Sequence, residues 1–267
     1  MIVDSHVHVV DESRVAFDPQ PFGSDWYRTH AVSMEGFEAE LDAVGVAHAV
    51  LVQAVGAYGH DCRYLAEAFP RGSDRYRWVC SVDPRRPDAI EALRGWVELG
   101  ATGVRLFAIG PYGDDWLDSP TTFNLWRLAS ERGLVVVATV LPGAIGRLAA
   151  PLERFAEVSV ALDHCGFAEP DRDGWADLQR LSGFANLHLK LSSIALGLDR
   201  DVDAAVRVAR FASLVGTQRL LWGSDYPQTH GRSYPEIVGF ARSATASLGI
   251  GPQAEILGGN AARLWGW

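Results

Sequence analysis

The feature that most constrains the fold is a regular alternation of short apolar runs with longer amphipathic stretches. The short runs are rich in aliphatic and β-branched residues, and most of them carry no charge. Near-continuous apolar runs of this length are typical of parallel strands that are covered on both faces. The sequence therefore predicts strands at residues 2–9, 48–54, 77–82, 103–108, 134–140, 158–163, 187–191 and 219–223.

The stretches between these runs have the spacing of amphipathic helices. Examples are SMEGFEAELDAVG, DAIEALRGWVELG and DVDAAVRVARFASLVG, which all end in glycine, a common residue after the last turn of a helix. Strands that alternate with helices favour an α/β fold, and eight of them favour a closed barrel over an open sheet. The 267 residues suit one barrel, which needs about 250. We therefore expect a single (β/α)₈ TIM-barrel domain over residues 1–267.

Composition limits the classes of partner. Acidic side chains outnumber basic ones by 33 to 24, which gives a net charge of −9. This excess argues against nucleic acid or an anionic membrane as the main partner and leaves a small anionic substrate open. The chain shows no membrane-spanning apolar run, no secretory leader and no paired cysteine motif. We expect a cytoplasmic protein that acts on a small molecule.

Polar residues stand at the ends of three predicted strands, where the active site of a (β/α)₈ enzyme lies. His6 and His8 are two residues apart on the first strand and so share a face. His164 ends the sixth strand and Asp225 the eighth. Imidazole is a common zinc ligand, and a carboxylate can bind a metal or take a proton from water. Each feature alone also suits a buried structural group or a turn, but together they predict a site at one mouth of the barrel.

Further motifs lie in order along the chain: DSHVH, GHDCRYL, GVRLF, LDHCG, KLSS, LWGSDYP and the closing GGNAARLWGW. With them the chain resembles the amidohydrolase-related family of TIM-barrel hydrolases. It is most similar to the lactonase branch of that family, with 2-pyrone-4,6-dicarboxylate lactonase, 4-sulfomuconolactonase and the sugar lactonases. The resemblance implies that His6, His8 and Asp225 are metal ligands and that Asp225 and His164 are catalytic.

Two positions depart from the metal-dependent pattern of the family. The fifth strand offers Thr139 where many relatives have a histidine, and a hydroxyl is a poor substitute for imidazole on zinc. On the fourth strand, Arg105 stands where two-metal relatives have a carboxylated lysine, and it stays protonated. A bridged two-metal centre is therefore not expected. One divalent ion, zinc or manganese, and metal-free activity, as understood for the pyrone dicarboxylate lactonases, both remain open.

The resemblance and the strand ends also suggest residues that contact the substrate. The candidates are Arg105, Tyr58, His60, Asp61 and Ser192. Arg105 would project into the pocket and bind a carboxylate in bidentate fashion, and its alternative is a structural ion pair with Asp83 or another acid at a strand end. The alternative for Asp61 is a cap on the following helix.

Three further expectations concern the surroundings of the site. The stretch from Asp11 to Ser33 is expected to close over the pocket as a lid or wall. Asp163 is expected to point away from the site, because neighbouring residues on a strand alternate between its faces. Lys190 is the only lysine of the chain, and genome base composition accounts for that bias.

We expect a hydrolase that opens the lactone of a small organic acid or sugar acid by attack of water, with Asp225 as general base. The substrate is expected to carry a carboxylate. Two alternatives stay open: a metal-dependent nonoxidative decarboxylase of the same superfamily, and a barrel that binds a ligand without catalysis. A homo-oligomer is also open, because Trp265 and Trp267 could pack on the barrel or in a subunit contact.

Overall fold

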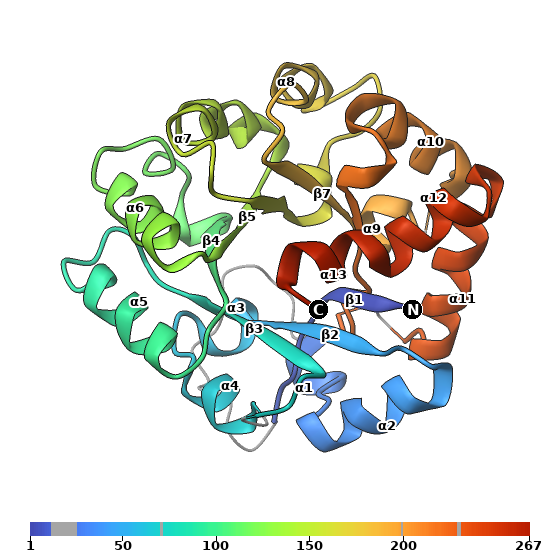
Figure 1. Cartoon of the computed structure of the whole chain (residues 1–267), viewed down its shortest axis with the longest axis horizontal. Coiled ribbons are helices and arrows are strands. Elements are labelled where there is room, and N and C mark those ends of the chain that lie inside the picture. The colour runs from blue at the N-terminus through green and yellow to red at the C-terminus, as the bar shows by residue number, and fades with distance from the viewer. Residues whose placement is uncertain (12–25, 70–71, 199, 229–230) are drawn as a thin grey trace.

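A computed structural model describes residues 1–11, 26–69, 72–198, 200–228 and 231–267 of the chain. Eight parallel strands form one sheet, with neighbours in chain order from β1 to β8. The two ends of the sheet meet where the His8 amide donates to the Tyr226 carbonyl and the Asp225 amide donates to the His6 carbonyl, each over 2.8 Å. Helices surround the ring of strands (Figure 1). The predicted (β/α)₈ barrel is confirmed.

The elements alternate along the chain as the periodicity predicts. The strands are β1 (Val3–Val7), β2 (His48–Val52), β3 (Tyr76–Ser81), β4 (Gly103–Ala108), β5 (Val135–Val140), β6 (Val160–Leu162), β7 (Leu187–Leu191) and β8 (Leu220–Trp222). The helices are α1 (Trp26–Thr29), α2 (Met34–Val44), α3 (Val55–Tyr58), α4 (Arg63–Ala68), α5 (Ala89–Glu98), α6 (Phe123–Arg132), α7 (Ala149–Arg154), α8 (Trp175–Leu181), α9 (Ser193–Leu196), α10 (Ala204–Val215), α11 (Tyr234–Thr245), α12 (Ile250–Ala254) and α13 (Asn260–Trp265).

Helix α2 shows why the amphipathic stretches form the outer layer. Its buried side chains Met34, Phe37 and Leu41 fall on one face, which packs toward the strands. The Ser33 hydroxyl caps the first turn by accepting a backbone hydrogen bond, and Gly45 ends the helix in the left-handed conformation with φ of 69°. Local signals and the apolar face therefore agree on the same helix.

The lower half of the barrel interior, toward the start of the strands, is apolar. It is filled by Val3, Val50, Val52, Val79, Val135, Val137, Ala161 and Leu221, with Ala261, Ala262 and Trp265 below them. Helix α13 lies across the middle of the ring in Figure 1. Its approach requires a glycine at Gly103, where a Cβ atom would lie 2.8 Å from the Val135 carbonyl and 3.1 Å from the Trp265 ring. Because this end is filled, a ligand can reach the interior only from the carboxyl ends of the strands.

The C-terminal tryptophans both pack within the chain. Trp265 is buried under the barrel, and Trp267 stacks on His48 with 4.7 Å between ring centroids and lies under the Arg77 guanidinium. The expectation of a homo-oligomer stays a prediction. In the described ranges, none of the helices has both the length and the apolar character needed to cross a membrane.

Candidate active site

The two histidines of β1 meet inside the upper half of the barrel. His6 lies on the strand and His8 just beyond it, and both are buried. Their Nε2 atoms are 3.2 Å apart. Nδ1 of His8 lies 2.8 Å from the Val52 carbonyl oxygen, which can only accept, so Nδ1 carries the proton. Nε2 of His8 is thereby left with a free lone pair that faces His6.

Asp225 follows β8 and faces the same point. Its Oδ1 atom lies 3.4 Å from Nε2 of His6 and 3.3 Å from Nε2 of His8. Both carboxylate oxygens are buried without a hydrogen-bond partner in the described part of the chain. Burial favours the neutral carboxyl, but His164 and the two β1 histidines outweigh it and hold the pKa of Asp225 below its usual range. The backbone at Asp225 is left-handed, with φ of 62°, a conformation that aspartate tolerates better than most residues.

These three atoms have the spacing of a tetrahedral metal site. Nδ1 of His6 donates to Asp163, so Nε2 of His6, like that of His8, presents a lone pair. The two lone pairs and the carboxylate oxygen lie 3.2–3.4 Å from one another and would repel without a cation between them. Ligands at about 2.0–2.1 Å from a tetrahedral zinc are about 3.3 Å apart. His6, His8 and Asp225 therefore fit one divalent ion, and the unpartnered oxygens of Asp225 are the observation that most favours it.

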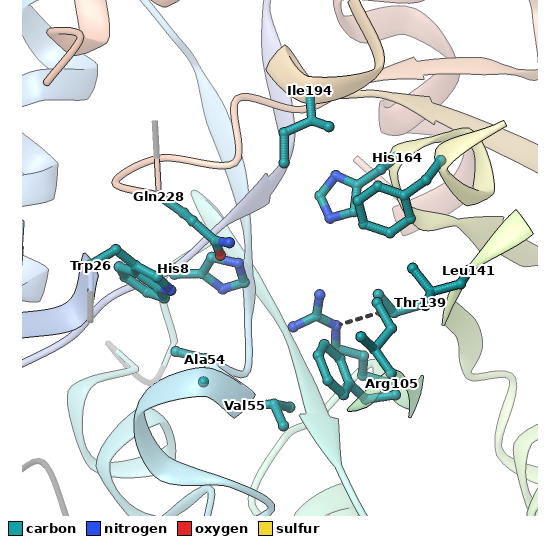
Figure 2. A pocket seen from close by; sticks show the side chains of 14 residues that line it. His8, Trp26, Ala54, Val55, Arg105, Thr139, Leu141, His164, Ile194 and Gln228 are labelled. Carbon is teal, nitrogen blue, oxygen red and sulfur yellow. Dashed lines mark hydrogen bonds between the residues drawn. The ribbon is translucent and has the colours of Figure 1, made fainter. Parts of the chain in front are cut away.

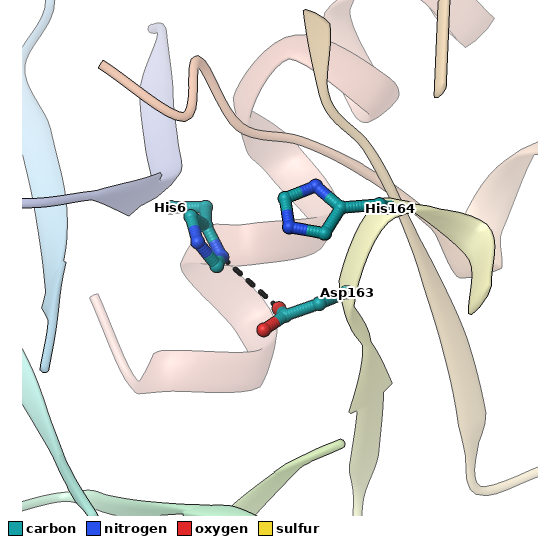
Figure 3. Close-up of side chains that lie close together, drawn as sticks. All are labelled: His6, Asp163 and His164. Carbon is teal, nitrogen blue, oxygen red and sulfur yellow. Dashed lines mark ion pairs between the residues drawn. The ribbon is translucent and has the colours of Figure 1, made fainter. Parts of the chain in front are cut away.

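A second group of potential ligands, His6, Asp163 and His164, lies next to the first (Figure 3). Nδ1 of His6 is 3.0 Å from Oδ1 of Asp163. However, the ammonium group of Lys190 already contacts both, 3.0 Å from Oδ1 of Asp163 and 3.1 Å from Nδ1 of His6. Lys190 is fully buried, so this group already holds a positive charge of the protein itself. The residues here do not fit a second ion.

The expectation that Asp163 points away from the site is wrong. Strand β6 ends at Leu162, and the next residues turn, with left-handed φ of 53° at both His164 and Cys165. The alternation of faces stops at the end of the strand, so Asp163 and His164 both point inward. Burial favours the neutral carboxyl, but His6, Lys190 and Arg105 hold the pKa of Asp163 well below its usual range.

His164 is oriented from behind by Ser192. Nδ1 of His164 lies 2.7 Å from the Ser192 hydroxyl, which also accepts the Ala195 amide at the start of α9. The imidazole ring lies 5.2 Å from the His6 ring between centroids. Burial lowers the pKa of His164, so its neutral form is favoured. Ser192 is buried and contacts His164 but does not line the cavity, so its predicted role in substrate binding stays a prediction.

Arg105 takes part in a buried ion pair and also lines the cavity. It pairs with Asp163 at 3.1 Å and donates from Nε to Thr139 over 2.9 Å and from a terminal nitrogen to the Gln53 carbonyl over 2.9 Å. The suggested partner Asp83 instead pairs with Arg85. One N–H group on each terminal nitrogen of Arg105 is left by these contacts. The structural pair and a ligand contact are therefore compatible.

The cavity lies at the carboxyl ends of the strands and has a volume of about 270 Å³. Figure 2 shows the guanidinium of Arg105, with its hydrogen bond to Thr139, between His8 and His164. The lining residues are His8, Trp26, Ala54, Val55, Gly56, Arg105, Phe107, Ile109, Thr139, Leu141, His164, Phe167, Ile194 and Gln228. Of the predicted lid, Trp26 reaches this cavity, and residues 12–25 lie outside the described residues.

The candidates after β2 do not line this cavity. The Tyr58 hydroxyl donates to the carbonyl of Asp11 over 3.0 Å and accepts from its amide. Nδ1 of His60 lies 2.8 Å from the Ser81 hydroxyl. Asp61 pairs with the Arg63 side chain and accepts its backbone amide, as a helix-capping residue would. Their predicted contact with substrate stays a prediction.

Sequence reasoning missed Lys190, Asp163 and Thr139 as members of the polar network. A signal was present for Lys190, because it stands alone in the apolar run LHLKL, and a lone buried lysine requires a partner. Thr139 was considered only as a missing histidine, whereas its hydroxyl donates to Asp163 over 2.7 Å.

Comparison with known proteins gives consistent matches. A family model described as amidohydrolase matches residues 3–267. L-fucono-1,5-lactonase of Burkholderia ambifaria is 25% identical over 293 residues, 98% of this chain and 94% of that protein. The 4-sulfomuconolactone hydrolase of Rhizobium radiobacter is 27% identical over 238 residues, 85% of this chain and 75% of that protein. A solved amidohydrolase from Burkholderia multivorans with bound zinc has a TM-score of 0.79 at 21% identity, covering 100% of this chain and 99% of that one.

Proposed function

The chain belongs to the amidohydrolase family, as the match over residues 3–267 shows, and from this premise we propose that it opens the lactone of a small organic acid by attack of water. The single observation that carries the proposal is the convergence of His6, His8 and Asp225 on one point beside the cavity. The names of the two sequence relatives, a lactonase and a lactone hydrolase, support the same reaction class.

We propose that His6, His8 and Asp225 hold one divalent ion, with zinc favoured over manganese because two imidazoles and a carboxylate suit it. When bound, such an ion polarises an ester carbonyl and makes water more acidic. The charges of the site agree with a cation. Asp163 and Asp225 are balanced by Lys190 and Arg105, so an added cation makes the site positive and favours an anionic substrate.

Asp225 is proposed as the general base. It takes a proton from the attacking water as the water oxygen bonds to the carbonyl carbon of the lactone, and it returns this proton to the ring oxygen as the ring C–O bond breaks. The unpartnered oxygens of its carboxylate leave it available for that transfer. The product is an open-chain hydroxy acid.

His164 and Arg105 are proposed to position the substrate. Ser192 holds Nδ1 of His164, so its Nε2 is the nitrogen available to the substrate's carbonyl oxygen. The N–H groups of Arg105 that Asp163 and Gln53 leave free are suited to the carboxylate of the substrate. Both donors lie in the same cavity, which sets the distance between the carbonyl and the carboxylate that the site accepts.

The Asp225→Asn variant tests this proposal. Without a basic carboxylate, kcat on a lactone substrate should fall by about 10²-fold or more. The matched control is Asp88→Asn, whose carboxylate pairs with Arg86 at the surface, does not line the cavity and should leave kcat unchanged when lost. Near-normal turnover by Asp225→Asn would rule out Asp225 as the general base.

A panel of candidate lactones should be assayed for proton release and for carbon dioxide together. Ring opening releases a proton without carbon dioxide, whereas carbon dioxide would identify a decarboxylase instead. Ligand protection against thermal unfolding without any product would favour a barrel that only binds.

A further inference from the structure

We propose that the cavity selects a lactone with an apolar body, few hydroxyl groups and one anionic group, and that it discriminates against polyhydroxylated sugar lactones. This inference rests on the proposed lactone hydrolysis and names the class of substrate. It decides between the two kinds of lactone in the names of the sequence relatives, a sugar lactone and a sulfomuconolactone.

The first argument is that most polar groups of the cavity are already committed. His8 bonds to the Val52 carbonyl through Nδ1 and faces the ion site through Nε2. The Thr139 hydroxyl accepts from Arg105 and donates to Asp163. Neither His8 nor Thr139 therefore has a polar hydrogen left for a ligand.

The remaining polar groups are few. Nε2 of His164 and the two free N–H groups of Arg105 are required by the carbonyl and the carboxylate of the substrate. Among the described residues that line the cavity, this leaves two side-chain groups, the amide of Gln228 and the indole N–H of Trp26 (Figure 2). A neutral sugar lactone has no carboxylate for Arg105. Each of its several hydroxyl groups also needs an acceptor, whereas all of these side-chain groups except the Gln228 carbonyl are donors.

The second argument is the apolar lining. Trp26, Val55, Phe107, Ile109, Leu141, Phe167 and Ile194 contribute to the walls. Leu141 is 45% exposed and Ile194 is 40% exposed, although both are large apolar side chains at the mouth of the cavity. A ligand with an apolar body would cover these two side chains, and removing them from water would contribute favourable binding free energy. Hydroxyl groups against the same walls would lose their hydrogen bonds to water without replacement.

The expected discrimination follows from the cost of unpaired hydroxyl groups. Each hydroxyl buried without a partner lowers affinity by about tenfold or more. Two or more such groups on a six-membered sugar lactone then give a preference of at least about 100-fold in kcat/KM for the lactone with few hydroxyls.

The experiment compares two lactone classes on the metal-loaded protein. Muconolactone has one carboxymethyl group and no hydroxyl, whereas L-fucono-1,5-lactone and D-glucono-1,5-lactone have several hydroxyls. We expect kcat/KM to be at least about 100-fold higher for muconolactone. Equal or faster opening of the sugar lactones would overturn the inference and leave the proposed hydrolysis intact.

Binding of acids that cannot be hydrolysed distinguishes failure of the substrate preference from failure of the proposed hydrolysis. If no lactone is opened, hydrolysis is wrong, and the preference is then measured with phenylacetate and gluconate by thermal shift. Binding of phenylacetate at least tenfold tighter than gluconate would support the apolar selectivity, and equal binding would overturn it.

Two variants test the mouth of the cavity. Leu141→Ser and Ile194→Ser should each lower kcat/KM for muconolactone by about three- to tenfold, because each removes apolar surface that the ligand covers. The matched control is Ile250→Ser, at a side chain that is 89% exposed and does not line the cavity. If both cavity variants behaved like this control, the apolar contact would be refuted.

Discussion

Replacing Lys190 with methionine tests whether one ammonium group neutralises the buried acid at the centre of the barrel. Lys190 is fully buried, and its Nζ atom lies 3.0 Å from Oδ1 of Asp163. At an effective dielectric constant of 20, this contact is worth about 5 kcal/mol of attraction. Burial of the ammonium offsets part of this, as the lowered pKa of Lys190 indicates. Methionine has a similar length but no charge, so it leaves Asp163 with Arg105 and Thr139 as its remaining partners besides His6.

The expected cost of Lys190→Met is about 3 kcal/mol in the free energy of unfolding, at the lower end of the range for breaking a buried pair. Urea unfolding at pH 7 in the presence of a chelator measures it without interference from metal binding. The control is Arg86→Met, which removes one partner of the exposed pair with Asp88, where Arg86 is 65% exposed. This control should cost less than about 1 kcal/mol. A Lys190→Met variant as stable as the control would refute the reasoning.

Two further predictions concern pH and metal. Burial lowers the pKa of His60 to about 4, so the unfolded chain takes up its proton at a higher pH than the folded one. From pH 7 to 5, the wild type should therefore lose up to about 2 kcal/mol more stability in urea unfolding than His60→Gln, and equal losses would contradict this. Zinc at 100 times its Kd should stabilise the wild type by about 2.7 kcal/mol, measured as a rise in Tm that chelation reverses. The His8→Ala variant should show no such rise, and a wild type that melts at the same temperature with and without zinc would contradict the site.

The fold could be predicted because its signals are local. Parallel strands covered on both faces must be apolar along their length, so every strand appears in the sequence as a run, and β4 (Gly103–Ala108) has the predicted bounds. The bounds of the strands are harder to predict, because the last residue of a strand depends on the turn that follows it. The run at residues 158–163 forms a strand only over Val160–Leu162, and this difference reversed the predicted direction of Asp163.

The site could be predicted only in part, because partners across the barrel are not encoded by spacing. Strand-end position was enough to bring His6, His8 and Asp225 to one point. The partner of Arg105 could not be chosen in the same way, because several strands end in an acid. Asp83 pairs with Arg85, two residues away along the chain, whereas Asp163 pairs with Arg105, two strands away in the barrel. Tyr58 and Asp61 were placed by resemblance. Tyr58 instead bonds to the Asp11 backbone across 47 positions of the chain, and Asp61 pairs with Arg63 two residues away.

The burial of Lys190 has a practical consequence for chemical labelling. No other lysine occurs in the sequence, so the folded protein offers no ε-amine to solvent. In a chain that starts at Met1, the α-amine is the remaining primary amine. Met1 is 67% exposed and precedes β1, so it lies at the amino ends of the strands, whereas the cavity lies at their carboxyl ends. An amine-directed dye or resin would therefore attach at one point and leave the mouth of the cavity facing bulk solvent. Attachment of a second dye would report that the barrel has opened.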